Sequence, residues 1–324
     1  MSVRVGVIGT GWFGRKIAMA LAGIREANLV GVTNRTFYRA ERVAAELGTA
    51  AYPTVAELLD EGRPELVVVA TADDNHLAAS VQSLEAGCHV LVEKPLATTS
   101  AEAHAIAAAA KKADRFLAVA HVLRFDEAHI ELAKRIHAGE LGDIRYVYAR
   151  RNLPVAMHTQ ASKLHPAVTA MPHDIDLLRW FLGSDPRKVT AHEAPAAGSD
   201  VLVAALEFDS ALAVVESCWL LPDTAPFDDA LALSVVGTEG SAAIRVPSSA
   251  MQLITQSGLE LVNSSYWPES DGVVRGALRE ELAYMVACVA DDRKPERLPL
   301  PDAIATVETM ERILQSLEEG RQSR

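Results

Sequence analysis

The chain has 324 residues, 49% of them hydrophobic, and a formal net charge of −12 at pH 7. This length accommodates about two domains with sizeable cores, and the acidic balance argues against nucleic acid or an anionic membrane surface as a partner. Three widely separated cysteines indicate free thiols in a reducing cytoplasm, where we expect the protein to act. No apolar run approaches about 18 residues and strand-like sequence begins at once, so we expect neither a membrane span nor a targeting segment.

A glycine-rich turn follows the first predicted strand, residues 3–9, and leads into a helix predicted over 14–23. Its pattern is GxGxxG, in which the first glycine permits a tight turn, the second lets the backbone approach a pyrophosphate and the third lets the helix pack closely on the strand. The N–H groups at the start of the helix then face the phosphates. The pattern therefore predicts a dinucleotide site formed by Gly9, Gly11, Trp12, Phe13 and Gly14.

The second predicted strand, residues 29–33, ends where a dinucleotide-binding domain reads the adenosine ribose. Sites for NAD usually place a carboxylate there, about 20 residues after the glycines, whereas this chain has Asn34 and Arg35, with Arg39 one turn later. An arginine can pair with the 2′-phosphate of NADP, so we expect NADP in preference to NAD and take these residues as cofactor-binding. The alternative is that the two arginines only belong to a solvated helix start.

Polar residues follow two further apolar strands, which we predict over 65–71 and 89–92. Ligands of open α/β sheets lie beyond the carboxyl ends of the strands. Four residues at these two strand ends are therefore predicted to bind the cofactor: Thr71, His76, Glu93 and Lys94.

Lys94 is also a candidate for catalysis. Pro95 stiffens the strand exit and restricts Lys94 to extended conformations, whereas surface lysines normally lie on mobile helices and loops. A lysine held beside a dinucleotide turn is therefore expected to act on the substrate, and the alternative is a solvated lysine at a strand end.

The first domain is predicted to end near residue 120. Helices are expected up to Gly48 and Gly87, both of which are C-cap signals, and over 100–113, with Ser100 as a possible N-cap. A last strand is predicted over 115–119. We therefore divide the chain into a dinucleotide-binding domain, 1–120, and a second domain, 121–324, whose C-terminal helix is a candidate to pack back on the first domain.

The second half alternates apolar and polar residues with the period of half-buried strands. A helix is predicted over about 127–137, and another helix ends at Gly183 with Ile175, Leu178 and Leu182 as its buried stripe. Strands are predicted over 143–153, 188–194, 200–208, 211–221, 229–236, 241–246 and 251–255.

Two stretches of the second half carry candidate site residues. The segment 150–172 is polar, and such loops often bind ligands; Arg150, Arg151 and Asn152 could face a polyhydroxyl or anionic substrate. His173 and Asp176 lie three residues apart at the start of a helix, so they share one face. Because a helix N-terminus disfavours imidazolium, His173 stays able to accept a proton.

A metal site is not expected. His158, His165 and His173 are seven and eight residues apart, and His121, His129 and His137 are eight apart. Neither spacing matches the compact ligand spacing of zinc sites on helices.

Several blocks occur in order along nearly the whole chain: GVIGTGWFG, LVVVAT followed by NH, LEAGCHVLVEKPLA, HVLRFD and HDIDLLRWFLG. In these blocks the chain resembles the glucose–fructose oxidoreductase and inositol dehydrogenase family (Gfo/Idh/MocA), and its tail over 281–316 resembles the closing helices of that family. The block that ends in EKPLA is highly specific.

The resemblance implies an α/β fold with an N-terminal Rossmann domain, a doubly wound parallel sheet, and a C-terminal α+β domain with a large, mostly antiparallel sheet. That second domain would bind the substrate, and its open sheet face would form a homodimer or homotetramer. The implied activity is that of an NAD(P)-dependent oxidoreductase, which transfers a hydride between nicotinamide and a secondary alcohol or ketone of a sugar, polyol or related carbonyl compound.

The resemblance also implies roles for residues. Lys94 and His173 would be catalytic, since His173 stands where the family keeps its catalytic histidine. His121 and Arg124 would line the cleft between the domains, although Arg124 by itself is equally consistent with a structural ion pair. The substrate-binding residues are thus expected to be His121, Arg124, Arg150, Asn152 and Asp176.

One position departs from the family pattern. Members usually have an aspartate four residues before the catalytic histidine, and this chain has Thr169 there. A threonine cannot balance the charge of the histidine, so Asp176, Asp174 or His165 could substitute for the aspartate. The departure keeps a second reading open, the reduction of a non-sugar carbonyl or imine. A third reading is a non-catalytic NAD(P)-binding sensor, against which the retained Lys94 and His173 argue.

Overall fold

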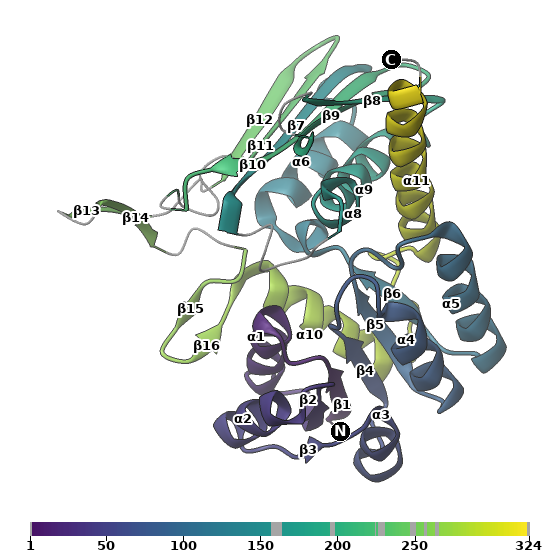
Figure 1. The fold of residues 1–324 in the computed structure, drawn as a ribbon, viewed down its shortest axis with the longest axis vertical. Helices are drawn as coiled ribbons and strands as arrows, with labels where there is room; N and C mark the ends of the chain where they lie inside the picture. Colours follow the sequence, from purple (N-terminus) through teal and green to yellow (C-terminus); the bar gives the residue numbers. More distant parts are fainter. Residues whose placement is uncertain are drawn as a thin grey trace. The chain divides into compact units, whose positions relative to one another are not determined.

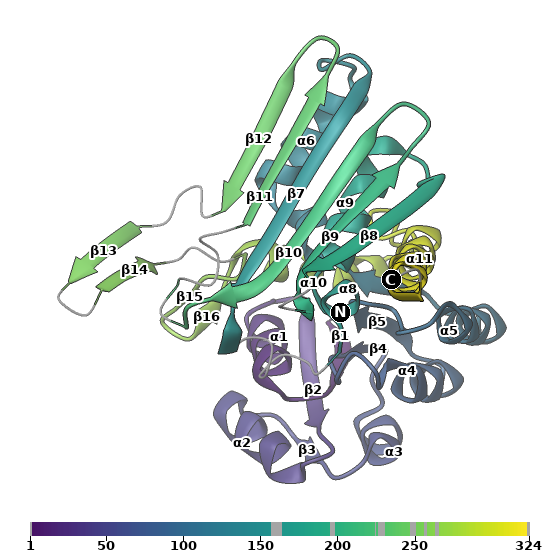
Figure 2. The same cartoon turned by 45° about the horizontal axis from the view of Figure 1, so that its top comes forward.

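The computed structural model describes residues 2–156, 164–194, 198–223, 225, 231–246, 251–255, 258–262 and 266–322. Their contacts group the chain into two units (Figures 1 and 2). The first unit contains Met1–Phe125 and Tyr266–Ile304, and the second contains Asp126–Ser265 and Ala305–Arg324. The division into domains over 1–120 and 121–324 stays a prediction about the chain's organisation.

The first unit contains a parallel sheet of six strands in the order β3-β2-β1-β4-β5-β6, which confirms the predicted Rossmann fold. Its central strands are almost wholly apolar, and Val5, Val7 and Val68 are buried, as in parallel sheets that are covered on both faces. The strands are β1 (Val3–Ile8), β2 (Ala27–Thr33), β3 (Ala51–Tyr52), β4 (Leu66–Val69), β5 (His89–Glu93) and β6 (Leu117–Ala120).

Helices of the first unit follow the strands along the chain. They are α1 (Trp12–Ala22), α2 (Phe37–Leu47), α3 (Val55–Glu57) with the π-helical turn η1 (Leu58–Gly62), α4 (His76–Glu85), α5 (Ser100–Ala113), the 3-10 turn η2 (Val122–Phe125) and α10 (Gly276–Ala290). Helix α10, far along the chain, packs against α1 and η2. The short strands β15 (Glu269–Ser270) and β16 (Val273–Val274) form a hairpin, and β16 contacts α1.

The predicted N-cap of α5 is wrong by one residue. Thr99 has the extended backbone that an N-cap needs, and its hydroxyl accepts a hydrogen bond from the N–H of Glu102 at 3.3 Å. Ser100 is instead the first residue of the helix.

The second unit contains a mostly antiparallel sheet in the order β12-β11-β7-β10-β9-β8, as predicted; β7 and β10 are its one parallel pair among the described strands. A separate two-stranded sheet contains the segment predicted as a strand over 251–255. The large sheet consists of β7 (Ile144–Pro154), β8 (Lys188–Ala194), β9 (Gly198–Glu207), β10 (Leu212–Leu221), β11 (Leu231–Gly237) and β12 (Ser241–Val246), and the small one of β13 (Met251–Thr255) and β14 (Gly258–Val262).

Helices cover one face of the large sheet (Figure 2). They include α6 (Glu127–His137), α8 (Pro166–Thr169) and α9 (Pro172–Leu182), while α11 (Leu300–Gln322) begins in the first unit and ends in the second. Ile175 and Leu178 are buried on α9 as predicted, whereas Leu182 is half-buried and Phe181 is buried in its place. Helix α9 contacts α6 and α8 as well as the sheet, so its apolar side is broader than a single stripe.

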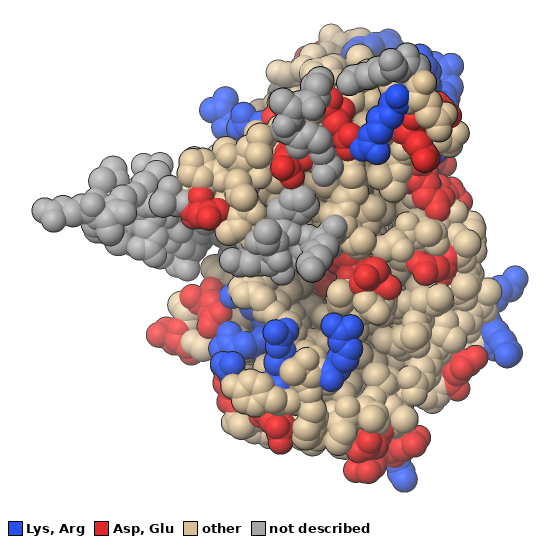
Figure 3. All heavy atoms as spheres, in the orientation of Figure 1, with Lys and Arg blue, Asp and Glu red and all other residues tan. Residues whose placement is uncertain are grey.

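Three further properties bear on the expected partners. Among the helices that the structure describes, none is both long and apolar enough to cross a membrane. No disulfide joins the three cysteines, of which Cys88 and Cys288 are buried. On the face drawn in Figure 3, acidic and basic side chains of the described residues are interspersed.

Candidate functional site

The glycines after β1 are explained by the packing around them. Gly9 has a φ of +99°, and a Cβ atom there would overlap the carbonyl oxygen of Ala70. At Gly14 a Cβ atom would overlap the carbonyl oxygen of Gly9. Around Gly11, in contrast, no atom lies within 4 Å of such a Cβ position. The turn is thus packed tightly beneath Gly9 and Gly14 and open beside Gly11, where the pattern expects a pyrophosphate.

The start of α1 suits an anion. Gly11 is its N-cap and supplies no side-chain hydrogen bond, and no acidic residue stands in the first turn. Unsatisfied N–H groups and the helix dipole favour negative charge at such an end. The residues of this turn therefore fit the pyrophosphate of a dinucleotide.

An aromatic cluster lies beside this turn. Trp12, 61% exposed, stacks on Phe13, whose ring centroid is 4.9 Å from that of Trp267. The ammonium group of Lys16 lies over Trp12 and pairs with Glu269 at 3.1 Å. Trp267 and Glu269 were not expected at the site, because nothing local in the sequence indicates that residues 266–275 return to α1.

The end of β2 carries cations and no acid. Asn34 donates from its amide to the hydroxyl of Thr10 at 2.9 Å, and its side-chain oxygen accepts from the N–H of Thr36 at 2.9 Å. Arg35 and Arg39 are exposed, and neither guanidinium group is bonded to another described residue. Two arginines are therefore available where the sequence predicts contact with the adenosine ribose.

Each of the two strand ends has its own hydrogen bonds, and one further bond joins the segment after β4 to the turn after β5. The hydroxyl of Thr71 donates to the carbonyl of Asn75 at 3.0 Å, and the N–H of Lys94 donates to the carboxyl of Glu93 at 3.3 Å. His76 is only 1% exposed, and its Nδ1 atom lies 2.7 Å from the carbonyl oxygen of Pro95. The structure thus brings together the four residues that the sequence predicts at these two strand ends.

Glu93 and His76 both have shifted pKa values. Burial raises the pKa of Glu93 to about 8, against the opposing effect of the positive charge of Lys94. Burial lowers the pKa of His76, although its bond to Pro95 acts in the other direction. Near pH 7 the two side chains are therefore mainly neutral, and Lys94 follows a carboxylic acid that can donate a hydrogen bond.

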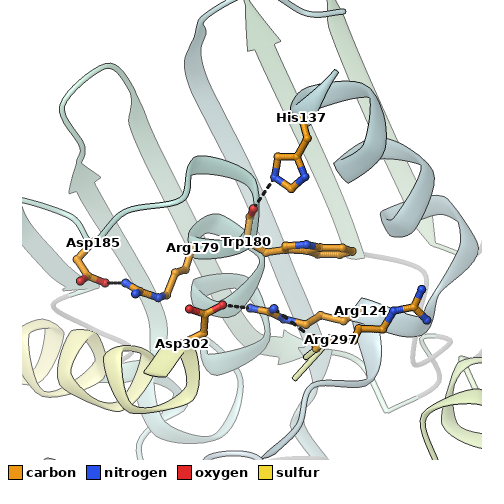
Figure 4. A network of polar contacts seen from close by, with 7 residues as sticks. All are labelled: Arg124, His137, Arg179, Trp180, Asp185, Arg297 and Asp302. Carbon is orange, nitrogen blue, oxygen red and sulfur yellow. Dashed lines mark hydrogen bonds and ion pairs between the residues drawn. The ribbon is translucent and has the colours of Figure 1, made fainter. Parts of the chain in front are cut away.

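Arg124 forms the structural ion pair that was one of its two expected roles (Figure 4). It is 2% exposed, and its guanidinium group donates to the carboxylate of Asp302 at 2.8 Å and to the carbonyl of Arg297 at 3.3 Å. His121, which follows β6 directly, is also buried at 4% exposure.

In the second unit, the start of α9 is held by an ion pair. Arg151 donates from Nε and Nη2 to the two carboxylate oxygens of Asp174, at 3.0 and 2.9 Å. His173 is half-buried next to Asp174, and Asp176, two residues further on, is 1% exposed. The grouping of Arg151 with substrate-facing residues is therefore corrected, because its guanidinium group points to α9.

Arg150 and Asn152 lie on the opposite face of β7 from Arg151. Asn152 donates to Glu216 on β10 at 3.0 Å, and the hydroxyl of Tyr148 donates to the same carboxylate. Arg150 stands directly opposite Glu216 in the strand register. Glu216 and Tyr148 are thus residues of this polar cluster that the sequence did not indicate, although strand alternation could have separated Arg151 from its two neighbours.

Of the residues that could replace the family aspartate, two have other partners. Asp174 is bound by Arg151. His165 accepts from the N–H of Ala167 at 3.1 Å and bonds Glu193 at 2.8 Å, so it caps α8. Thr169 is buried at the end of α8.

No group of three or more His, Cys, Asp or Glu side chains within the described part of the chain is arranged to hold a metal ion. His158 lies outside the described residues.

Comparisons with known proteins agree with this arrangement. A family model described as an oxidoreductase family with an NAD-binding Rossmann fold matches residues 3–121, and one described as the GFO/IDH/MocA C-terminal domain matches residues 129–243. Inositol 2-dehydrogenase 1 of Saccharopolyspora erythraea is 31% identical over 263 residues, 77% of this chain and 76% of that protein. UDP-N-acetylglucosamine 3-dehydrogenase of Acidithiobacillus ferrooxidans is 33% identical over 189 residues, 58% of this chain and 57% of that protein.

The fold is also similar to solved structures. Myo-inositol 2-dehydrogenase from Lactobacillus plantarum has a TM-score of 0.85 at 22% identity, over 99% of this chain and 98% of that chain. GenD2 from gentamicin A biosynthesis, in complex with NAD, has a TM-score of 0.82 at 25% identity, over 98% of this chain and 95% of that one.

Proposed function

The chain belongs to the GFO/IDH/MocA oxidoreductase family, and from this premise we propose that Lys94 and His173 carry the proton chemistry of a polyol or sugar dehydrogenase. Its first domain is an NAD-binding Rossmann fold. The observation that supports Lys94 most directly is its place. Lys94 directly follows β5, and the dinucleotide turn directly follows β1 in the same parallel sheet. Lys94 and the turn therefore both lie at the carboxyl edge of that sheet.

The bound nicotinamide supplies or accepts the hydride. The side chains of the protein must then hold the substrate oxygen and move its proton. Lys94 hydrogen-bonds this oxygen, and either Lys94 or His173 removes the hydroxyl proton in oxidation and returns it in reduction. His173 is in the first turn of α9, where the helix dipole favours the neutral ring that accepts a proton.

For substrate recognition we propose His121 and Asp176, the latter in the same helix as His173. Arg150 and Asn152, which the sequence predicts to bind the substrate, lie on the face of β7 opposite Arg151, whose partner Asp174 is in α9. They therefore lie on the face of the sheet that α9 does not cover. The buried ion pair of Arg124 with Asp302 supports a positioning role for Arg124. Thr169 in place of the family aspartate keeps a carbonyl or imine reductase as the second candidate function.

The test of this proposal is the Lys94→Ala variant. We expect turnover to fall by about 10²- to 10⁴-fold, because general acid–base groups contribute that much, while the dissociation constant of the cofactor stays nearly unchanged. Turnover is measured by nicotinamide absorbance with a panel of polyols and sugars, and cofactor binding by calorimetry. Lys111→Ala, at an exposed position of α5, is the control. Unchanged turnover in Lys94→Ala would refute the assignment.

We further propose that NADP is the preferred cofactor, which the two unbonded arginines after β2 support. In Arg35→Ala we expect the KM for NADP to rise about 10- to 100-fold, since a hydrogen bond to a charged group contributes about 1.5–3 kcal/mol, and the KM for NAD to change little. Arg42→Ala on α2 is the control, because its guanidinium group lies over Tyr38. A wild-type protein that prefers NAD, or an equal loss with both cofactors, contradicts this choice.

We also propose that the open face of the large sheet forms a homodimer or homotetramer. Tyr146, Leu212, Val203 and Val236 share this face by strand register and are 36–42% exposed. Large apolar side chains that are exposed together on one face of a sheet are a common mark of a protein–protein contact.

A further inference from the structure

We propose that His76 is a positioning residue for Lys94, which holds the carbonyl group of Pro95 from a buried ring and does not itself contact the cofactor. This inference rests on the proposed function of Lys94. It also replaces the cofactor contact that the sequence predicts for His76 with a contact to the turn after β5.

The hydrogen bond connects two loops that leave adjacent strands. His76 is the first residue of α4, and its Nδ1 atom lies 2.7 Å from the Pro95 carbonyl oxygen, 19 residues away in sequence. A carbonyl oxygen only accepts, so Nδ1 must carry the proton, and the neutral ring is in its Nδ1–H form. His76 is therefore the donor in this bond, and the Pro95 carbonyl oxygen is the acceptor.

Hydrogen bonds hold the backbone on both sides of the Lys94 side chain. Pro95 has no N–H group, so it cannot donate a backbone hydrogen bond that would hold the turn. On the other side, the N–H of Lys94 already donates to the carboxyl group of Glu93. Glu93 thus holds the backbone before the Lys94 side chain, and His76 holds it one residue after, which limits the directions that this side chain can take.

The start of α4 is itself well anchored. The hydroxyl of Thr71 donates to the carbonyl of Asn75 at 3.0 Å, and the N–H of Asn75 donates to the carbonyl of Ala72 at 2.8 Å. Strands β4 and β5 are paired up to Val69 and Val92. The imidazole ring is therefore fixed on one rigid loop and can fix the other.

The surroundings of the ring argue against a ligand contact. The side chain is 1% exposed, so the ring presents almost no surface to a bound cofactor. Asp73 and Lys94 are the charged groups that act on the ring, with opposite effects, and burial keeps its pKa low. A neutral ring adds no positive charge beside Lys94, which a protonated ring would do.

The test uses two amide substitutions that differ in reach. In His76→Asn the amide N–H occupies about the place of Nδ1–H, and in His76→Gln it occupies about the place of Nε2. We expect His76→Gln to lower kcat about 10- to 100-fold, because small displacements of catalytic groups have effects of this size, and His76→Asn to keep most of it. In both variants the cofactor dissociation constant, measured by calorimetry, should stay within about 3-fold of the wild-type value.

Ser80→Ala is the matched control, because Ser80 lies one turn further along α4 and its buried hydroxyl has no partner among the described residues. A second readout does not depend on activity: because burial lowers the pKa of His76 below its ordinary value, ¹⁵N NMR of the imidazole at about pH 7 and above should show a neutral ring with a protonated Nδ1. A ring protonated at Nε2, or a cofactor affinity that falls as much as kcat, would overturn the inference. So would equal losses in the Asn and Gln variants, or no loss in the Gln variant.

The two proposals fail in different ways. If Lys94→Ala retains turnover, the proposed function is wrong whatever the His76 variants do. If Lys94→Ala is inactive and His76→Gln is fully active, only the positioning role of His76 is wrong.

Discussion

Glu93 is a buried carboxyl group whose protonation links stability to pH. Burial raises its pKa from 4.5 to about 8. Because the folded chain keeps this proton to a higher pH than the unfolded chain, the contribution of Glu93 to stability is complete below about pH 4.5 and is lost as the pH rises through about 8. The carboxylate that forms above this range is the species that the buried site disfavours.

We therefore expect Glu93→Gln to be as stable as the wild type at pH 5 and more stable at pH 9, by an amount on the order of a few kcal/mol. Glutamine keeps the shape of the protonated acid and cannot ionise. Urea denaturation at the two pH values measures the difference, with Glu85→Gln at an exposed position of α4 as the control. The same stability difference at both pH values would show that Glu93 does not retain its proton.

The sequence predicts the structural role of some single residues but not the partners of others. Gly9 and Gly14 could be predicted, because their requirement comes from the backbone of the turn itself. The partners of His76 and Arg124 could not, because Pro95 and Asp302 lie 19 and 178 residues away. A buried side chain finds its partner through tertiary packing, which leaves no local pattern.

At the scale of elements, the ion pair between Arg151 and Asp174 fixes the first turn of α9 to β7. Their side chains are 11% and 5% exposed, and the contact is bidentate. A buried pair stabilises little compared with an apolar pair, but removing one partner leaves the other charge uncompensated. The consequence for the site is that His173 depends on this contact for its place on the helix.

We expect Asp174→Asn to destabilise the protein by about 3–5 kcal/mol and to lower kcat, whereas the double variant Arg151→Met/Asp174→Leu should regain much of the stability. Chemical denaturation measures the change in stability, and a turnover assay measures the change in kcat. Glu131→Gln, which removes an exposed pair with Arg135 on α6, should change stability very little. If Asp174→Asn is as stable as that control, the pair does not anchor α9.

Elements were predicted well where a local period exists. The strands of the large sheet fall close to their predicted ranges, since alternation reports a half-buried strand. The sheet order was not predictable, nor was the separate pairing of β13 with β14, because strand pairing joins distant segments. The N-cap of α5 was missed because Thr99 and Ser100 both have hydroxyl groups, and the backbone angle that distinguishes them is not visible in the sequence.

At the scale of the whole chain, contacts between segments that are distant in sequence limit how much of the fold can be predicted from local sequence patterns. Helix α10 packs on α1, although more than half of the chain separates them. Its sequence is mostly apolar, which predicts a buried helix but does not indicate that α1 is its neighbour. The family blocks, in contrast, identify the fold as a whole, because their order along the chain is itself a long-range property.

Across three strands of the large sheet, an exposed apolar row marks the proposed contact between copies. Leu212, Tyr146 and Val236 are register neighbours and are 41%, 38% and 42% exposed. Charges on this row should oppose association, because an interface core excludes unpaired charge. We expect light scattering to give the wild type a multiple of 34.8 kDa, and Leu212→Glu/Val236→Glu the mass of one chain. Lys134→Glu on α6 should keep the wild-type mass. A monomeric wild type, or a double variant with unchanged mass, refutes an interface at this face.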